Sequence, residues 1–474
     1  MSVFLTKKGY ILIKNDFKDE DIEEIKQECR VSPFISYTTT LPPNSFNVYR
    51  STPNQLILPR HYGYNTIGDP DIDKLKDFEP TKINIPFAGS LREEQQGIVD
   101  KYLEHKESGG GIISIPCGGG KTVISLGIIS ALKVKCIVVV HKEFLVTQWR
   151  ERIEQFLPDA KIGHVQGSIV NVEGCDIVIA MLQSLSMRKY PEDTFSDIGL
   201  AIFDECHHLG AEVFMRSFFK ISTKYMLGLS ATPNRKDGLT KVFEWFIGPM
   251  IYCRKARDEE DICEVEMYKY KHKDPRYSKV VLRYTKAPDY VKMLTNIITW
   301  EDRDDIIIKV LQKVILENRN ILILSDRRNH LDRLYNKIKE IDVWETPSVG
   351  YYVGGMKELA LKQSESKQVI LGTFKMASEG MDIPHLDTVF LISPKSDIEQ
   401  SVGRILRKKA KDRIVTPKII DICDSFSTFK NQEFKRLKFY KQNNYPIKVF
   451  DGTGKFIKNY ADKKKEKPPT MCII

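Results

Sequence analysis

The chain has 474 residues, a length that suits two or three domains, and its 42% hydrophobic and 10% aromatic content excludes the intrinsically disordered class. A formal net charge of +10, from 73 Lys and Arg against 63 Asp and Glu, is compatible with a polyanionic partner without establishing one. Because no apolar run reaches the length of a membrane span and the N-terminus shows no signal-peptide pattern, we expect a soluble intracellular protein, cytoplasmic or nuclear, without a membrane partner.

The first half of the chain changes character near residue 86. Residues 1–85 carry turn formers and little sustained periodicity, so we predict a small N-terminal accessory region with one helix over 16–29. Residues 86–254 alternate short β-branched runs with longer mixed segments, which is typical of a parallel sheet covered by helices on both faces. The expected strands cover 111–115, 136–140, 176–181, 199–203 and 225–229.

The second half begins with a segment of different composition. Residues 255–300 are predicted to be a linker or insert, in which the alternation of Tyr with Lys over 268–273 fits either a phosphate contact or a solvated edge strand. The α/β pattern then restarts over 301–447 and closes on a helix near 429–440, and 448–474 is predicted to be a basic tail. The second set of expected strands covers 320–325, 348–353, 368–372, 388–392 and 418–422.

A glycine loop followed by Lys and Thr lies between the expected strand at 111–115 and an apolar-periodic segment. A strand that leads through glycines into a helix builds a phosphate cradle, because backbone N–H groups and the helix N-terminus both face the anion. Lys121 is expected to reach the β- and γ-phosphates and the Thr122 hydroxyl to hold Mg²⁺. The general P-loop pattern has a glycine where Ile115 stands, so the match departs from it at one position.

Two acids follow the expected strand at 199–203. At the carboxyl end of a strand beside a P-loop, Asp204 is placed to coordinate Mg²⁺ through water and Glu205 to orient and deprotonate the attacking water. The neighbouring Cys206, His207 and His208 do not predict a zinc site, because adjacent side chains at a strand end diverge and the 9 cysteines form no C-x-x-C pair.

An arginine pair in the second α/β region completes the set of candidate catalytic groups. Arg404 and Arg407 are spaced to share one helix face, and two guanidinium groups in register suit phosphate or developing transition-state charge. We expect them to complete the site when two lobes close.

In this order, these motifs resemble the core of the superfamily 2 helicases and translocases. The similarity covers about 86–445 and is to the DExH branch that contains XPB, restriction-type helicase subunits and the poxvirus transcript-release helicase. The resemblance implies two tandem RecA-like domains, ATP and Mg²⁺ as cofactors, and nucleic acid as partner.

The resemblance also implies roles for particular residues. It places adenine contact at Arg92 and Gln95, phosphate binding at Gly118, Gly119, Gly120, Lys121 and Thr122, and metal binding at Thr122 and Asp204. It makes Asp204, Glu205 and His207 the catalytic motif, and Gln400, Gly403, Arg404 and Arg407 the second-lobe nucleotide motif. The implied nucleic-acid contacts are His141, Gln148, Gln183, Ser184, Thr373 and Ser378, and the implied coupling residues are Ser230, Ala231, Thr232 and Asp382.

One departure from the branch affects the predicted activity. XPB-like enzymes carry an Arg-Glu-Asp element for strand separation where this chain has Arg235, Lys236 and Asp237, so the chain departs from the branch at this element. The favoured interpretation is a DNA-stimulated ATPase, a 3′-to-5′ helicase or translocase of viral or cellular transcription or repair, acting with a polymerase or transcription complex. In a large DNA virus it would work in the viral factory or the virion.

Several alternatives stay open at this point. They are an RNA helicase, a duplex DNA translocase that does not unwind, a polypeptide-moving motor, and a nucleic-acid-binding scaffold that does not hydrolyse ATP.

Overall fold

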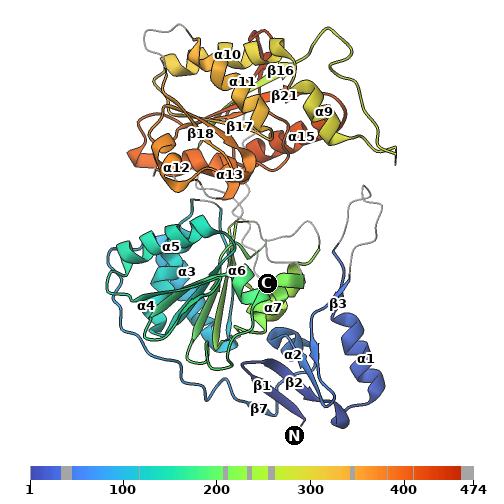
Figure 1. The fold of residues 1–474 in the computed structure, drawn as a ribbon, viewed down its shortest axis with the longest axis vertical. Helices are drawn as coiled ribbons and strands as arrows, with labels where there is room; N and C mark the ends of the chain where they lie inside the picture. Colours follow the sequence, from blue (N-terminus) through green and yellow to red (C-terminus); the bar gives the residue numbers. More distant parts are fainter. Residues whose placement is uncertain are drawn as a thin grey trace. The chain divides into compact units, whose positions relative to one another are not determined.

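The structure is a computed structural model that describes residues 2–33, 45–116, 118–206, 212–221, 223–231, 238–254, 262–284, 286–341, 347–379, 381, 383–408 and 410–460. The described chain divides into two compact units (Figure 1). The first is made of residues 2–115 and 119–254, and the second is made of residues 116 and 118 together with those from 262 onward. No helix among the described residues combines the length and the apolar character that crossing a membrane requires.

The N-terminal region is a small five-stranded sheet in the order β5-β6-β2-β1-β7, blue in Figure 1. Its strands are β1 (Val3–Thr6), β2 (Gly9–Ile13), β5 (Arg50–Ser51), β6 (Gln55–Leu58) and β7 (Ile72–Asp73). The region also holds α1 (Asp19–Glu28), which corresponds to the predicted helix, α2 (Arg60–Thr66) and the short pair β3 (Arg30–Val31) and β4 (Phe46–Asn47). Ile11, Val48 and Ile57 share a buried apolar cluster with Phe218 and Phe243, so this sheet packs on the first unit's core.

The first unit contains an eight-stranded sheet in the order β11-β10-β12-β9-β13-β14-β8-β15. All neighbouring strands run parallel except β10 and β11. The strands are β8 (Gly110–Ser114), β9 (Cys136–Val140), β10 (Ile162–Gln166), β11 (Ile169–Asn171), β12 (Ile177–Met181), β13 (Leu200–Phe203), β14 (Tyr225–Ser230) and β15 (Met250–Cys253). Strands such as β9 are buried along their whole length because helices cover both faces of a parallel sheet.

The helices of the first unit form two layers. In Figure 1, α3 (Glu93–Glu104), α4 (Lys121–Leu132) and α5 (Glu143–Phe156) lie on one side of the sheet, and α6 (Leu182–Met187) and α7 (Glu212–Phe218) lie on the other. The two apolar clusters agree with this arrangement, since one contains Ile98, Ile124 and Trp149 and the other contains Leu182 and the Phe243 side chain of α8 (Thr240–Ile247).

The second unit repeats the architecture with its own eight-stranded sheet, in the order β18-β19-β17-β20-β21-β16-β22-β23. Its strands are β16 (Glu264–Tyr270), β17 (Ile321–Ser325), β18 (Val349–Tyr352), β19 (Val369–Thr373), β20 (Thr388–Leu391), β21 (Lys418–Asp424), β22 (Ile447–Asp451) and β23 (Phe456–Tyr460). Its helices are α9 (Tyr290–Ile297), α10 (Glu301–Leu316), α11 (Arg328–Lys339), α12 (Glu358–Glu365), α13 (Phe374–Glu379), α14 (Glu399–Gly403) and α15 (Ser427–Gln442). Two tandem RecA-like α/β domains are therefore the fold class, as the sequence predicted.

The structure differs from the sequence analysis at both ends of the second unit. Strand β16 pairs with β21 on one side and β22 on the other, so residues 264–270 are an interior strand and not a linker or an edge strand. The polar side chain of Lys269 is tolerated there because it pairs with Glu433 of α15. Residues 447–460 form β22 and β23 of the same sheet and not the start of a tail, and residues 461–474 lie outside the described residues.

Candidate active site in the first unit

The loop between β8 and α4 has the backbone of a phosphate cradle. Gly118 and Gly120 have φ angles of +87° and +85°, a region in which side chains with a Cβ are strained. A Cβ on Gly120 would also lie 2.3 Å from Nε2 of Gln95. The loop ends where α4 begins at Lys121, so the N–H groups of the helix N-terminus follow directly on the glycine loop.

The segment predicted to contact adenine lies against this loop. The backbone N–H of Arg92 donates to Oε1 of Gln95 at 3.1 Å, which caps the start of α3. Nη2 of Arg92 donates to the carbonyl of Gly119 at 3.2 Å. The structure thus brings Arg92 and Gln95 against the glycine loop, although Arg92 and Gly119 are 27 residues apart in the sequence.

Lys121 and Glu205 meet across this edge of the sheet. Nζ of Lys121 lies 2.7 Å from Oε1 of Glu205, with side-chain exposures of only 11% and 18%. Glu205 follows β13 with φ of +50°, a left-handed conformation that is uncommon for a residue with a side chain and recurs at functional sites. A γ-phosphate placed between the ammonium and the carboxylate would exchange this ion pair for contacts of its own.

Asp204 is the buried member of the acidic pair. Its carboxylate accepts a hydrogen bond of 2.8 Å from Nε1 of Trp149, and 7% of the residue is exposed. Burial, and then the charge of Glu205, raise the pKa of Asp204 to about 6, while Lys121 and the Trp149 hydrogen bond oppose the rise. A bound cation favours the ionised form, and the oxygen donors of Asp204 and Thr122 are the type that Mg²⁺ prefers, so the residues present fit this ion.

Trp149 is a functional candidate that the sequence analysis did not single out. Its neighbour Gln148 was predicted to contact nucleic acid, but the contact between Trp149 and Asp204 joins residues 55 positions apart. Composition and periodicity carry no signal for such a pairing.

The predicted nucleic-acid contacts of the first unit follow neighbouring strands. His141 comes directly after β9. Gln183 and Ser184 lie in the first turn of α6, which starts at Leu182 directly after β12, and β12 pairs in parallel with β9. The Ser184 hydroxyl accepts a hydrogen bond from the backbone of Gly167 at 2.9 Å. Because parallel strands end at one edge, these residues are gathered on the edge that also carries the glycine loop.

The predicted coupling segment is attached to the strand that precedes the glycine loop. The carbonyl of Ser230 accepts a hydrogen bond from the backbone N–H of Ile115 at 3.1 Å, and Ala231 is buried. Thr232 of this segment and the catalytic candidate His207 lie outside the described residues.

The second unit holds the remaining candidates on α13, α14 and the turn that follows. Thr373 ends β19, and its hydroxyl accepts a hydrogen bond from the backbone of Met376 at 3.4 Å. Ser378 lies on α13, Gln400 and Gly403 lie on α14, and Asp382 is outside the described residues.

The sequence analysis expected Arg404 and Arg407 on one α-helix. The structure differs, because the α-helix ends before Arg404. Helix α14 ends at Gly403 and a 3₁₀ turn covers Arg404–Leu406. The Arg404 side chain is 7% exposed and donates to the carbonyls of Ala377 at 2.5 Å and Met381 at 2.6 Å. It therefore ties the predicted nucleotide motif to the segment that carries the predicted nucleic-acid contacts.

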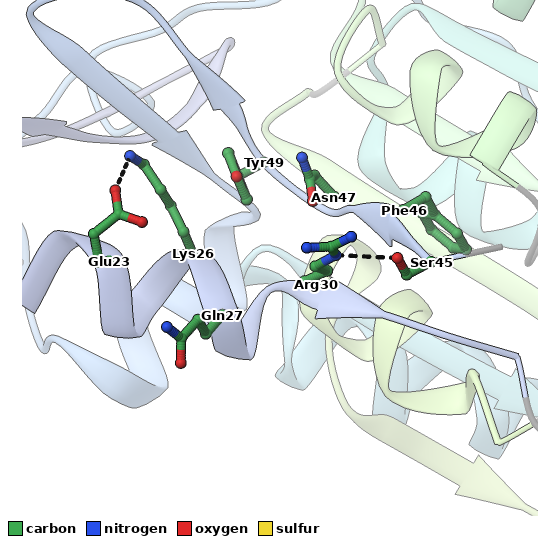
Figure 2. A pocket seen from close by; sticks show the side chains of 8 residues that line it. All are labelled: Glu23, Lys26, Gln27, Arg30, Ser45, Phe46, Asn47 and Tyr49. Carbon is green, nitrogen blue, oxygen red and sulfur yellow. Dashed lines mark hydrogen bonds and ion pairs between the residues drawn. The ribbon is translucent and has the colours of Figure 1, made fainter.

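A polar pocket of about 450 Å³ lies elsewhere, between α1 and the β3–β4 pair of the N-terminal region (Figure 2). Lys26 pairs with Glu23, and Nε of Arg30 donates to the hydroxyl of Ser45 at 3.0 Å. The residues that line it are Glu23, Lys26, Gln27, Arg30, Ser45, Phe46, Asn47 and Tyr49, and the predicted site residues are not among them.

The fold and the first-unit site define a P-loop ATPase with two RecA-like domains. Residues 88–235 match the family of the type III restriction enzyme res subunit. L396 of Acanthamoeba polyphaga mimivirus, which carries the name of an ATP-dependent RNA helicase, is 38% identical over 94% of this chain and 86% of its own length.

More distant relatives agree on the class. QP509L of African swine fever virus, also named an ATP-dependent RNA helicase, is 24% identical over 74% of this chain and 73% of its own length. XPB2 of Sulfurisphaera tokodaii, named a DNA 3′-5′ translocase, is 28% identical over 69% of this chain and 80% of its own length.

The chain belongs to the superfamily 2 helicases, in the XPB and restriction-type branch found in large DNA viruses. It is an ATP hydrolase that acts as an ATP-dependent nucleic-acid helicase or translocase.

Proposed function

We propose that the chain is a Mg²⁺-dependent, DNA-stimulated ATPase that moves 3′-to-5′ along DNA. The observation that carries this proposal is the Lys121–Glu205 ion pair beside the buried Asp204, at the sheet edge where the glycine loop enters α4. Hydrolysis of a γ-phosphate needs a cation at the phosphate, a carboxylate for the metal and a base for water, and we assign these roles to Lys121, Asp204 and Glu205.

In the proposed mechanism the loop N–H groups and Lys121 bind the β- and γ-phosphates of ATP, while Arg92 and Gln95 contact its adenine ring. Thr122 and Asp204 would hold Mg²⁺, and this ion would supply positive charge to offset the negative charge of the phosphates. Glu205 releases Lys121 to the nucleotide and accepts the proton of the attacking water. His207 is proposed to support this step.

The second unit supplies the sensing groups in this proposal. Arg404 is held by the carbonyls of Ala377 and Met381, so we assign it to positioning rather than to direct phosphate contact. Arg407, with Gln400 and Gly403, is proposed to sense the γ-phosphate. Ser230, Ala231, Thr232 and Asp382 are proposed to couple hydrolysis to movement.

The nucleic acid is proposed to bind through its backbone, at His141, Gln148, Gln183, Ser184, Thr373 and Ser378. Backbone contact carries little base specificity, which suits a motor that travels along any sequence. DNA and the 3′-to-5′ direction are supported by the name of XPB2. An RNA helicase is the second candidate, because the relatives L396 and QP509L are both named as RNA helicases.

A polymerase or transcription complex is the proposed protein partner. The support is the resemblance to the transcript-release branch together with the viral origin of the relatives. In a virus-encoded chain, the proposed site of action is the viral factory or the virion.

Steady-state ATP hydrolysis measured without polymer, and with single-stranded DNA, duplex DNA or RNA, tests the proposal. We expect DNA to stimulate most, and Glu205→Gln to lower kcat by about 10²–10⁴-fold through loss of the base. Greater stimulation by RNA would replace the DNA assignment, and stimulation by duplex alone would indicate a translocase without unwinding. If the native protein hydrolyses ATP at the same rate with each polymer as without any, the proposal of a nucleic-acid motor is overturned.

A further inference from the structure

Trp149, on the helix that follows β9, is hydrogen-bonded to Asp204, the carboxylate that we propose as a metal ligand. Trp149 lies near the middle of α5, and 1% of it is exposed. Its ring packs in the apolar cluster that contains Ile115, Ile124 and Val140, and its Nε1–H donates to Oδ2 of Asp204 at 2.8 Å. The indole is therefore fixed on its faces by packing and at its edge by a charge-assisted hydrogen bond.

This contact constrains the carboxylate. Indole nitrogen is a donor only, so it holds one carboxylate oxygen in a single orientation and cannot itself bind a cation. Donors that hold a ligand group in place commonly set the geometry and affinity of a metal site. The orientation in which Asp204 would meet Mg²⁺ would therefore depend on where α5 places Trp149.

Helix α5 also carries a predicted nucleic-acid contact next to Trp149. Gln148 is half-buried and precedes Trp149 in the chain, while His141 lies two residues before the helix starts at Glu143. A helix is stiff over one turn. A shift of α5 that brings Gln148 onto a nucleic-acid strand therefore displaces the indole of Trp149 by a comparable amount. The hydrogen bond carries that displacement to Asp204 without any intermediate residue.

We propose that Trp149 is a positioning residue that couples nucleic-acid binding on α5 to the metal-binding geometry of Asp204. The inference rests on the proposed function, because it takes α5 as a nucleic-acid contact and Asp204 as a metal ligand. It adds a direct route by which the polymer raises the rate of hydrolysis, within the first unit alone.

The decisive variant keeps the ring and removes only the donor. Benzothienylalanine at position 149 replaces the indole N–H with sulfur at nearly the same volume, and Trp149→Phe is a genetically encoded second variant. The matched control is the same benzothienyl replacement at Trp300, a second-unit tryptophan whose Nε1 donates to Oδ1 of Asn296 at 3.4 Å. Both replacements delete one indole hydrogen bond, and only one of them reaches Asp204.

Three quantities are measured on the full chain. They are ATP turnover with and without the most stimulating polymer, binding of a fluorescent ADP analogue across a Mg²⁺ titration, and polymer affinity by anisotropy. At position 149 we expect the stimulation by polymer to fall roughly tenfold and the half-saturating Mg²⁺ for ADP binding to rise, since a hydrogen bond to a charged group is lost. Polymer affinity is expected to stay within about twofold of native, because the backbone-contacting side chains are intact.

The outcomes separate this inference from the proposed function. If the native protein is stimulated and the 149 variant is stimulated equally, with an unchanged Mg²⁺ midpoint, Trp149 is only a packing residue and the inference is overturned. If the two replacements have equal effects, the loss is general and the inference is likewise overturned. A native protein without polymer stimulation overturns the proposed function, and the coupling with it.

Discussion

The two RecA-like units share one architecture but use buried charge in different ways. In the second unit, buried ions face each other: Arg303 donates to both oxygens of Asp424 at 2.9 and 2.8 Å, and both side chains are fully buried. Arg436 pairs similarly with Asp421 at 2.8 Å. These pairs join α10 and α15 to β21, and the hydroxyl of Tyr277 also donates to Asp424.

In the first unit, the buried Lys135 is paired with Asp197 at 2.7 Å, but two other buried charges meet neutral partners. Arg60 is 4% exposed and donates to the carbonyls of Gly109 at 3.0 Å, Lys224 at 3.1 Å and Thr223 at 3.3 Å. The buried carboxylate of Asp204 accepts from the indole of Trp149. A buried ion with an opposite charge fixed beside it holds structure, whereas a buried carboxylate held by a neutral donor keeps its charge available to a cation.

The largest expected effect is on the fully buried pair of the second unit. Arg303→Met leaves Asp424 as an uncompensated buried charge, and we expect a loss of about 3–5 kcal/mol in the free energy of unfolding. Urea unfolding read by circular dichroism measures it. Arg303→Met combined with Asp424→Asn removes the charge and keeps an acceptor for Tyr277, so it should recover part of the loss. A single variant within about 1 kcal/mol of native would show that the pair does not hold the unit.

The corresponding change in the first unit should cost less. Arg60→Met removes the guanidinium donors to three carbonyls but strands no charge, so we expect a loss of about 1–3 kcal/mol in the free energy of unfolding. The same urea series compares the two variants directly. A loss equal to that of Arg303→Met would mean that the kind of partner does not matter, and the contrast drawn between the units would be wrong.

The sequence predicted what local patterning encodes. The run at 136–140 is apolar and β-branched, and β9 covers those same residues. The glycines, Lys121 and the acids after β13 were found because a phosphate cradle needs these residue types next to one another. The N-terminal sheet was missed, and two of its strands, β5 and β7, have only two residues each, too few to show a period.

Other features depend on partners that are remote in the chain. Strand β16 looked like a solvated segment because Lys269 is polar, and the Glu433 that pairs with it is 164 residues away. The spacing of Arg404 could not show that its guanidinium group donates to backbone carbonyls of another segment. The contact between Trp149 and Asp204 was also missed because the two residues are 55 positions apart in the sequence.

The smallest expected effect is a difference in acid sensitivity between the units. Burial, and then the charge of Arg60, lower the pKa of His61 to about 3. Burial also lowers the pKa of His330, but there the carboxylate of Asp304, 3.1 Å from Nε2, opposes the shift. Both side chains are neutral in the folded chain, whereas an unfolded histidine titrates near pH 6.5.

The sign of the pH effect follows from proton uptake. Below about pH 6.5 the unfolded chain binds a proton that the folded chain refuses, so the free energy of unfolding falls with pH, by at most about 1.4 kcal/mol per pH unit for each group. For His61 this loss continues toward pH 3 and amounts to about 2 kcal/mol between pH 7 and 5. For His330 the loss should be smaller, since Asp304 favours the protonated form.

Urea titrations at pH 7 and 5, each followed by a brief deuterium pulse read peptide by peptide, report the two units separately. We expect His61→Gln to flatten the acid dependence of the first unit by more than His330→Gln flattens that of the second. Equal flattening would mean that Asp304 gives His330 no protection. If His330→Gln flattens the acid dependence more than His61→Gln does, the comparison between the units is reversed. The more acid-sensitive histidine would then lie in the second unit, where Arg303 and Arg436 are paired with carboxylates.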